Sequence, residues 1–317
     1  VGVLEVPEEK IVLKERLHPG KMLLVNTVQG KVLNDEEVKE YYAKKQPYGE
    51  WLDSYLVQLK DIKIPNLPVE EYTKEERMRL QKAFGYTYEE YRSSIGKMAL
   101  NGVEATASMG IDTPLAVLSH EHQPLFNYFK QLFAQVTNPP IDCIREEIVT
   151  STSVYVGRDG NLLEEEPKNC QVLKINNPIL TNTDMLKIKN MKVEGFKAVT
   201  VPITYYKSAP LDRAMDRLFV EVDRAHRAGA NILILSDRGV DENHMAIPSL
   251  LAVSAVHQHL VKTKKRTSLA IILESGEPRE VHHFATLLGY GACAINPYLA
   301  LDTIHELIEE GMIKKDY

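Results

Sequence analysis

The stretch Ile232-Leu233-Ile234-Leu235-Ser236-Asp237-Arg238 decides the fold, because an unbroken apolar run stops there at polar residues. A short run without alternating polar positions is typical of a strand that is buried on both faces. Leu269-Ala270-Ile271-Ile272-Leu273, followed by Glu274-Ser275-Gly276-Glu277, repeats the pattern. Each polar stop marks the carboxyl end of a predicted strand, where a turn leads into a helix.

Further apolar runs extend this pattern in both directions, at Val172–Ile175, Ala198–Ile203 and Ala292–Ile295. Helices are predicted after the five runs, over 183–190, 211–228, 247–262, 277–288 and 299–311. Buried strands that alternate with helices predict an α/β fold with a parallel sheet covered on both faces. Five such units favour a (β/α) barrel over an open doubly wound sheet, although the spacing does not decide whether the barrel closes.

The N-terminal part of the chain has a different pattern of short strands and separate helices. Strands are expected at Ile11–Leu13, Met22–Val25 and Lys31–Leu33, a small antiparallel piece that cannot be stable alone. Turns are expected at 18–20 and 29–30, a linker at 64–68 and a β-hairpin over 155–163 around Asp159-Gly160. Helices are expected from a cap at Asn34 through Tyr42 and over 51–59, 73–83, 87–100 and 126–133.

The composition excludes several classes of protein. The hydrophobic fraction of 44% and the charged fraction of 26% are ordinary for a soluble globular protein, and a net charge of −6 argues against nucleic acid as a partner. The three cysteines lie far apart and match no disulfide, metal or iron–sulfur spacing. The lack of a disulfide framework predicts a protein of the reducing cytoplasm. Because no apolar run approaches the ~18 residues of a membrane span, we expect no membrane partner. The start at Val1 without methionine favours a piece of a longer protein over a processed complete one.

Candidate functional residues lie where the predicted strands end. Asp237 and Glu274 are possible paired carboxylates for acid–base chemistry, and Arg238 is a possible ligand for phosphate or carboxylate. No activated nucleophile accompanies them in the sequence. The favoured interpretation is therefore structural: Asp237 and Arg238 pair with each other or cap the next helix, and hold the loop at the strand end.

Two other motifs have simple structural interpretations. Gly289-Tyr290-Gly291-Ala292 precedes a predicted strand, whereas a dinucleotide-binding glycine motif follows one, so a helix-ending glycine cap is favoured. His120-Glu121-His122 and His282-His283 do not have the HExxH zinc spacing. We predict no metal site and no catalytic residue in the chain.

The order of motifs along the whole chain resembles the large chain of glutamate synthase, in the segment between its glutaminase and flavin domains. The N-terminal motifs resemble the tail of the class II glutaminase domain, and the later ones resemble the family's central domain. The motifs are Arg16-Leu17-His18-Pro19-Gly20-Lys21-Met22, Pro47-Tyr48-Gly49-Glu50-Trp51-Leu52, Met98-Ala99-Leu100-Asn101-Gly102-Val103-Glu104-Ala105-Thr106, Ser108-Met109-Gly110-Ile111-Asp112-Thr113-Pro114 and Gln135-Val136-Thr137-Asn138-Pro139-Pro140.

This resemblance implies three parts: a glutaminase tail over 1–35, a connector over 36–70 and the central α/β domain over 71–317. It implies that the full-length enzyme makes glutamate from glutamine and 2-oxoglutarate, and that it carries FMN and an iron–sulfur cluster outside this chain. The chain would join the adjoining glutaminase and FMN domains, which are its expected partners. It would help wall the ammonia tunnel, with Ser108 and Thr137 as the candidate tunnel-lining residues, and be inactive alone.

Two other classes of function stay open at this point. The chain is alternatively a self-contained (β/α)-barrel enzyme that acts on a small phosphorylated substrate through Asp237, Arg238 and Glu274. It is otherwise a structural interaction module with no role in a tunnel.

Overall fold

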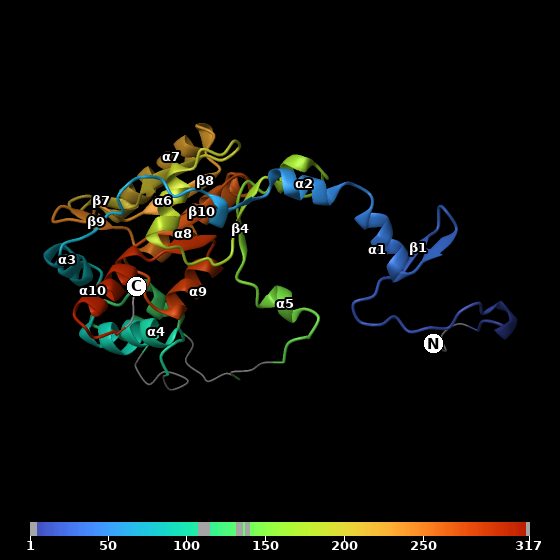
Figure 1. Cartoon of the computed structure of the whole chain (residues 1–317), viewed down its shortest axis with the longest axis horizontal. Coiled ribbons are helices and arrows are strands. Elements are labelled where there is room, and N and C mark those ends of the chain that lie inside the picture. The colour runs from blue at the N-terminus through green and yellow to red at the C-terminus, as the bar shows by residue number, and fades with distance from the viewer. Residues whose placement is uncertain (1–4, 107–114, 131–135, 137–139, 315–317) are drawn as a thin grey trace. The chain divides into compact units, whose positions relative to one another are not determined.

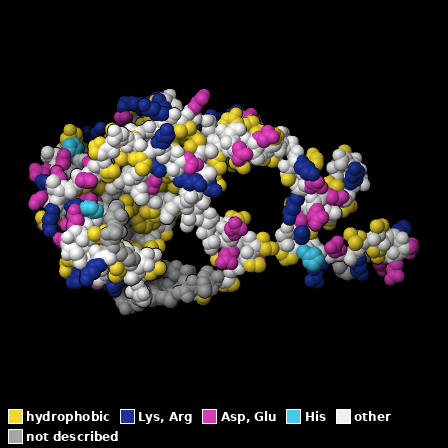
Figure 2. Space-filling model, viewed as in Figure 1, with side chains coloured by type: hydrophobic (Ala, Val, Ile, Leu, Met, Phe, Trp, Pro, Cys, Tyr) yellow, Lys and Arg dark blue, Asp and Glu magenta, His cyan; other side chains and the backbone are white. Residues whose placement is uncertain are grey.

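The computed structural model describes residues 5–106, 115–130, 136 and 140–314. The chain divides into two compact units, Val1–Ser54 with Pro140–Thr150, and Tyr55–Pro139 with Ser151–Tyr317. Acidic and basic side chains are interspersed over the face shown in Figure 2, as expected for a chain with a small net charge. None of the helices within the described ranges is both long and apolar enough to cross a membrane.

The first unit is small and is organised around one helix. Strands β1 (Leu24–Asn26) and β2 (Lys31–Leu33) pair antiparallel, and the turn between them is held by the Asn26 side chain, which accepts from the Val28 and Gln29 amides. Helix α1 (Asp35–Ala43) begins at a capping box formed by Asn34 and Glu37. The helices α2 (Tyr48–Tyr55) and α5 (Glu146–Val149) complete the regular elements.

The expected turn at 29–30 and strand at Lys31–Leu33 are confirmed, whereas the expected strand at Ile11–Leu13 is wrong. That segment has no ladder partner among the residues that the structure describes, and Val12 is 99% exposed. Apolar composition alone does not make a strand, since a strand needs a partner for its backbone groups.

The second unit is built on a four-stranded parallel sheet in the order β11-β10-β8-β6. Its strands are β6 (Ala198–Pro202), β8 (Ile232–Ser236), β10 (Ala270–Glu274) and β11 (Ala294–Asn296). All residues of β8 and β10 are buried, as the apolar runs in the sequence predicted. The α/β fold with a parallel sheet is confirmed, and the strands within the described ranges do not form a closed barrel.

The two faces of this sheet enclose two separate apolar clusters. Because side chains alternate along a strand, Leu233 and Leu235 pack with the helices on one face, while Ile232 and Ile234 pack on the other. The first face is covered by α7 (Leu211–Arg227), α8 (Ser249–Lys262) and α9 (Val281–Gly289), and α7 and α8 are seen beside the strands in Figure 1. The second face is covered by α6 (Asn182–Asn190) and by strand β5 (Val172–Ile175).

Strand β5 does not join the parallel sheet, which corrects the expectation for the first apolar run. It pairs parallel with β3 (Val57–Gln58) and antiparallel with β4 (Val154–Gly157). The predicted hairpin over 155–163 is also wrong, because β4 pairs with β5 rather than with the residues directly after Gly160. A separate two-stranded sheet joins β7 (Thr204–Tyr206) to β9 (His244–Ala246).

The predicted helices at 73–83, 183–190, 211–228, 247–262 and 299–311 are confirmed to within a few residues, and that at 277–288 begins later, as α9. The other α-helices of this unit are α3 (Lys74–Ala83), α4 (Gly96–Asn101) and α10 (Tyr298–Glu309). Helix α4 follows a π-helical turn at Glu90–Ile95. The helix expected over 126–133 is instead a 3-10 segment at Leu125–Phe129, which places Phe126 in the core against the His283 ring. Residues 131–133 lie outside the described residues.

We predict that Ile234→Ala lowers the free energy of unfolding by about 2–5 kcal/mol, the usual cost of a cavity in a core that cannot collapse. Ile234 is fully buried in the middle of β8. Urea unfolding followed by circular dichroism measures the change. The matched control is Val220→Ala on α7, where Val220 is 53% exposed. Equal stabilities of the two variants would contradict the proposed core.

Candidate functional site

The polar residues at the strand ends lie side by side in a single row. Strand register pairs Ser236 with Glu274, and Glu274 with Asn296. Ser236 and Glu274 each come two residues after an isoleucine of the second apolar cluster, so all point to the same face. The row is a polar layer at the carboxyl edge of a water-excluded sheet.

Glu274 is the centre of this layer and is only 2% exposed. Its carboxylate accepts from Lys189 Nζ of α6 at 2.8 Å, from Arg238 Nε at 2.9 Å and from Ser236 Oγ at 2.6 Å. Burial raises the pKa of Glu274, but the bonds from Lys189 and Ser236 and the Arg238 charge outweigh it, so its pKa lies below the usual range. Glu274 is therefore held ionised between two cations.

Asp237 has a different environment, although it is the next residue after Ser236. It is 1% exposed and accepts from Ser275 Oγ at 2.5 Å and from the Gly276 amide at 3.1 Å. Burial raises the pKa of Asp237 to about 7, against the lowering effect of these two bonds and of the nearby Tyr298 hydroxyl. No cation contacts this carboxyl among the described residues, so it is protonated over much of the acid range.

The space around Asp237 is closed by aromatic rings. A Cβ atom on Gly276 would lie 2.7 Å from the Phe84 ring and 3.1 Å from the Tyr298 hydroxyl. Tyr298 is buried, its hydroxyl makes no well-formed hydrogen bond to a described residue, and burial followed by the Asp237 charge raises its pKa. The Asn296 side-chain oxygen is likewise buried without a partner in the described part of the chain.

The expected pairing of Asp237 with Arg238 is wrong, because the two side chains have separate partners. Arg238 donates to Glu274, to the Tyr72 hydroxyl at 2.7 Å and to Glu70 at 3.1 Å, and its guanidinium lies 4.1 Å from the Tyr298 ring centre. The expected cap on the next helix is also wrong for these two residues. Glu277 supplies it instead, accepting from the Ser249 amide at 2.8 Å at the start of α8.

Sequence reasoning missed Arg279, which joins the strand-end turn to the segment before α4. Its guanidinium donates to Glu90 at 3.0 Å and to the Phe84 and Gly85 carbonyls at 3.2 and 3.0 Å, and it stacks on the Tyr86 ring. The sequence held one signal for Arg279, because it closely follows Glu277 in the same strand-end turn. Lys189 and Tyr72 gave no such signal, because nothing in their local sequence indicates a partner at a strand end.

Other candidate residues are placed as follows. Gly291 comes two residues after the end of α9 and has a φ of +118°. A Cβ atom at this position would lie 2.5 Å from the His257 ring. Both observations agree with a glycine that is required where the helix ends. His282 and His283 are engaged separately, with the Phe126 carbonyl and the Arg279 amide. Ser108 and Thr137 lie outside the described residues.

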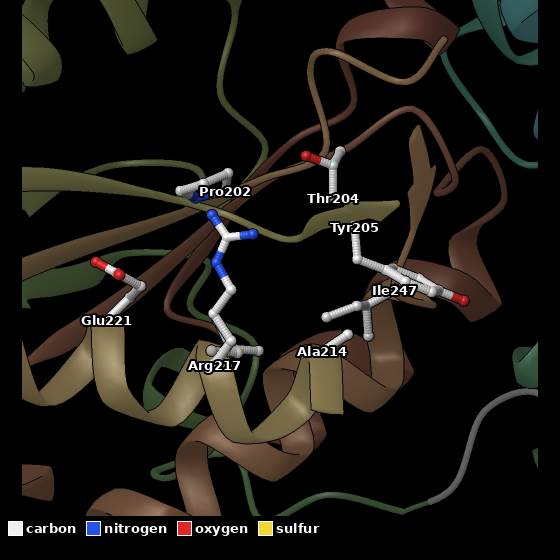
Figure 3. Close-up of a pocket in the computed structure, with 8 residues that line it drawn as sticks. Pro202, Thr204, Tyr205, Ala214, Arg217, Glu221 and Ile247 are labelled. Atoms are coloured by element: carbon white, nitrogen blue, oxygen red, sulfur yellow. The ribbon is translucent and has the colours of Figure 1, made fainter. Parts of the chain in front are cut away.

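A pocket of about 150 Å³ lies between α7 and the ends of β6 and β7. Arg217 reaches from α7 toward Pro202, with Glu221 one turn further along the helix (Figure 3). This volume is below the usual range for small-molecule sites.

A larger groove of about 590 Å³ lies between the 70–83 segment and the loop after β8, and its lining includes four carboxylates: Glu70, Glu76, Asp241 and Glu242.

We predict that Asp237→Asn gains stability relative to the natural chain as pH rises from about 4 to about 7. The carboxyl is protonated in the folded chain and ionised in the unfolded chain over this window, so its contribution is present at low pH and lost toward pH 7. The difference in unfolding free energy should change by about 1.4 kcal/mol per pH unit, because one pKa unit corresponds to that energy. Urea unfolding at several pH values measures it.

The control for this prediction is Asp216→Asn, which removes the same charge from an exposed position on α7. It should show no pH-dependent difference in that window. A constant difference between Asp237→Asn and the natural chain across the window would contradict the burial of a protonated carboxyl.

Comparison with known proteins agrees with these observations. The glutamate synthase central domain matches residues 79–317, and the class II glutamine amidotransferase family matches residues 1–51. The NADPH glutamate synthase large chain of Bacillus subtilis is 46% identical over the whole chain, and the NADH glutamate synthase of Schizosaccharomyces pombe is 39% identical over 99% of it. Ferredoxin-dependent glutamate synthase 2 of Synechocystis is 39% identical over 96%.

The chain spans a fifth or less of the length of these relatives, namely 20%, 16% and 20%. The two family matches together cover residues 1–51 and 79–317, a range that includes the strand ends. The chain belongs to the glutamate synthase family and carries its central domain.

Proposed function

We propose that this chain is the connecting part of a glutamate synthase, which makes L-glutamate from L-glutamine and 2-oxoglutarate. One observation carries the proposal: a single chain matches the glutaminase family at its start and the central domain over the rest. The adjoining glutaminase and FMN domains are the proposed partners. A cytoplasmic location is part of the same proposal.

The proposed parts are the glutaminase tail over 1–35, the connector over 36–70 and the central domain over 71–317. Exposed apolar side chains in the first part support its belonging to a larger domain, since Val12 and Val28 are 99% and 95% exposed. An isolated two-stranded ladder such as β1–β2 is marginal in water. The rest of a glutaminase domain would supply the missing cover.

We further propose that the central domain is barrel-like in curvature. The chain after β5 returns to the parallel sheet, where Ile179 bridges Ile295 in parallel beside β11. The side chains of β5 pack against the same face of the sheet as α6. The packing of β5 on one face of the sheet and the bridge from Ile179 to β11 support a barrel-like arrangement.

FMN and an iron–sulfur cluster belong to the full-length enzyme in this proposal, and neither the 590 Å³ groove nor the metal-ligating side chains of the described residues fit these groups. The described residues contain no set of three or more His, Cys, Asp or Glu side chains arranged to hold a metal. The lining of the 590 Å³ groove includes four carboxylates and one arginine, Arg79, so its net charge is negative and would repel the phosphate of FMN. The flavin chemistry is therefore assigned to the neighbouring domain.

The roles proposed for Asp237, Arg238 and Glu274 are structural. Glu274 is bound to two cations, Arg238 to Glu274, Tyr72 and Glu70, and Asp237 to the Ser275–Gly276 turn. A self-contained enzyme acting on a phosphorylated substrate would need these groups free to reach it. The alternative is therefore not favoured.

We propose Ser108 and Thr137 as tunnel-lining residues, from their place in the family motifs and from the chemistry of ammonia. A small neutral molecule passes hydroxyls and carbonyls by exchanging hydrogen bonds, whereas a carboxylate would hold it as ammonium. Both residues belong to segments rich in Gly or Pro, which suit fixed loops.

We predict that the purified chain forms no glutamate from glutamine and 2-oxoglutarate and carries no flavin. The physical reason is that Asp237, Arg238 and Glu274 already bind groups of the protein itself. Absorbance near the flavin bands and a glutamate assay with an added reductant measure both properties. A stoichiometric flavin, or turnover of a phosphorylated substrate, would support the self-contained enzyme instead.

In the full-length enzyme, we predict that Thr137→Leu uncouples the two reactions, because a bulky side chain obstructs passage of ammonia. Glutamine should be consumed faster than 2-oxoglutarate is converted. The matched control is Thr137→Ser, which keeps the hydroxyl and should keep one-to-one coupling. Normal coupling in Thr137→Leu would remove Thr137 from the tunnel wall.

A further inference from the structure

A pocket of about 310 Å³ lies at the carboxyl end of β5 and is separate from the polar layer around Glu274. It is formed by the 3-10 turn Leu59–Asp61, the end of β5, the turn that follows it and the first turns of α6. The lining residues are Gln58, Leu59, Lys60, Lys174, Ile175, Asn176, Asn177, Ile179, Leu180, Asp184 and Lys187. Its volume is at the lower end of the range for small-molecule sites.

Positive charge dominates this pocket, because three lysines and one aspartate line it. The side-chain ammonium groups of Lys60 and Lys174 have no ion-pair or hydrogen-bond partner within the described part of the chain. Within the described ranges, Lys187 Nζ donates to the Leu59 carbonyl alone, at 3.4 Å. Asp184 is used in the capping box of α6, where it accepts from the Thr181 amide at 3.1 Å and from the Thr181 hydroxyl at 2.8 Å.

Amide groups add donors to the same pocket. Asn177 accepts from the Ile179 amide through its side-chain oxygen, so its amide nitrogen is left to donate elsewhere. The N-terminus of α6 is already capped by Thr181 and Asp184, so the groups left to bind an anion are the lysines and the amide nitrogen. Carboxyl ends of strands followed by helices are a common place for anion binding in α/β proteins.

We propose that this pocket binds the phosphate group of a small molecule through Lys60, Lys174 and Lys187. Lysine supplies a compact ammonium charge with three donors and is a common phosphate ligand, and three such charges suit the double negative charge of a phosphate. No arginine lines the pocket. The acidic groove beside α3 shows the opposite charge pattern, so the positive charge here is local.

The proposal does not depend on the glutamate synthase role proposed above. Free phosphate and a phosphate ester share the chemistry that the lysines recognise, and the pocket has room for a few organic atoms beside the phosphate. If these lysines instead bind the surface of a partner protein, this chain should not bind small anions.

Isothermal titration calorimetry of the chain with inorganic phosphate, at constant ionic strength, tests the proposal. We expect saturable binding at one site per chain. Lys60→Gln and Lys174→Gln should each weaken it by about tenfold, the usual effect of losing one hydrogen bond to a charged group. Repeating the titration with glycerol phosphate distinguishes a phosphate ester from free phosphate as the ligand. Tighter binding of the ester indicates a phosphorylated small molecule, and equal binding indicates free phosphate.

The matched control is Lys262→Gln, which removes the same charge at the end of α8, outside the pocket, and should leave the affinity unchanged. Thermal unfolding of each variant checks that folding is intact, and Lys60→Gln is the safer variant because Lys60 is exposed. A titration that does not saturate overturns the proposal. Equal losses in Lys262→Gln and the pocket variants overturn it as well, because they would indicate general charge attraction.

Discussion

The second unit depends on the ionised carboxylate of Glu274 at the end of a buried strand. A charge in this position is costly unless it is paired and hydrogen-bonded. Three elements supply its partners: Lys189 from α6, Arg238 from the turn after β8, and Ser236 from the neighbouring strand. Satisfying this one carboxylate therefore fixes α6 on one face of the sheet and sets the direction of the turn after β8.

The same constraint continues into the segment that precedes the sheet in sequence. Arg238 also binds the Tyr72 hydroxyl, while Arg279 binds Glu90 and the Phe84 and Gly85 carbonyls. Arg77 of α3 is buried in a pair with Asp302 of α10 at 2.8 Å. The helices before the central sheet are thus attached by arginines with several bonds each, which suits connections that must be geometrically defined.

Local sequence was sufficient for elements whose stability comes from their own pattern. The strands β8 and β10 were predicted from their unbroken apolar runs, the helices α7 and α8 from their place after such runs, and the cap at Asn34 from its side-chain chemistry. Elements that depend on distant partners were not predicted. Strand β5 has the same apolar run as the others, yet it pairs with β3 and β4, because pairing is decided by which strand is nearby.

The sequence by itself determined the family, the parallel α/β core and the presence of Asp237, Arg238 and Glu274 at strand ends. Only the tertiary structure decided their partners, since Lys189 lies 85 residues from Glu274 and Tyr72 lies 166 residues from Arg238. It also separated two neighbouring strand-end carboxyl groups: Glu274 is ionised between cations, while Asp237 has a pKa raised by burial. The physical reason is that charge state depends on solvent exclusion and on groups brought near by folding, which local sequence does not record.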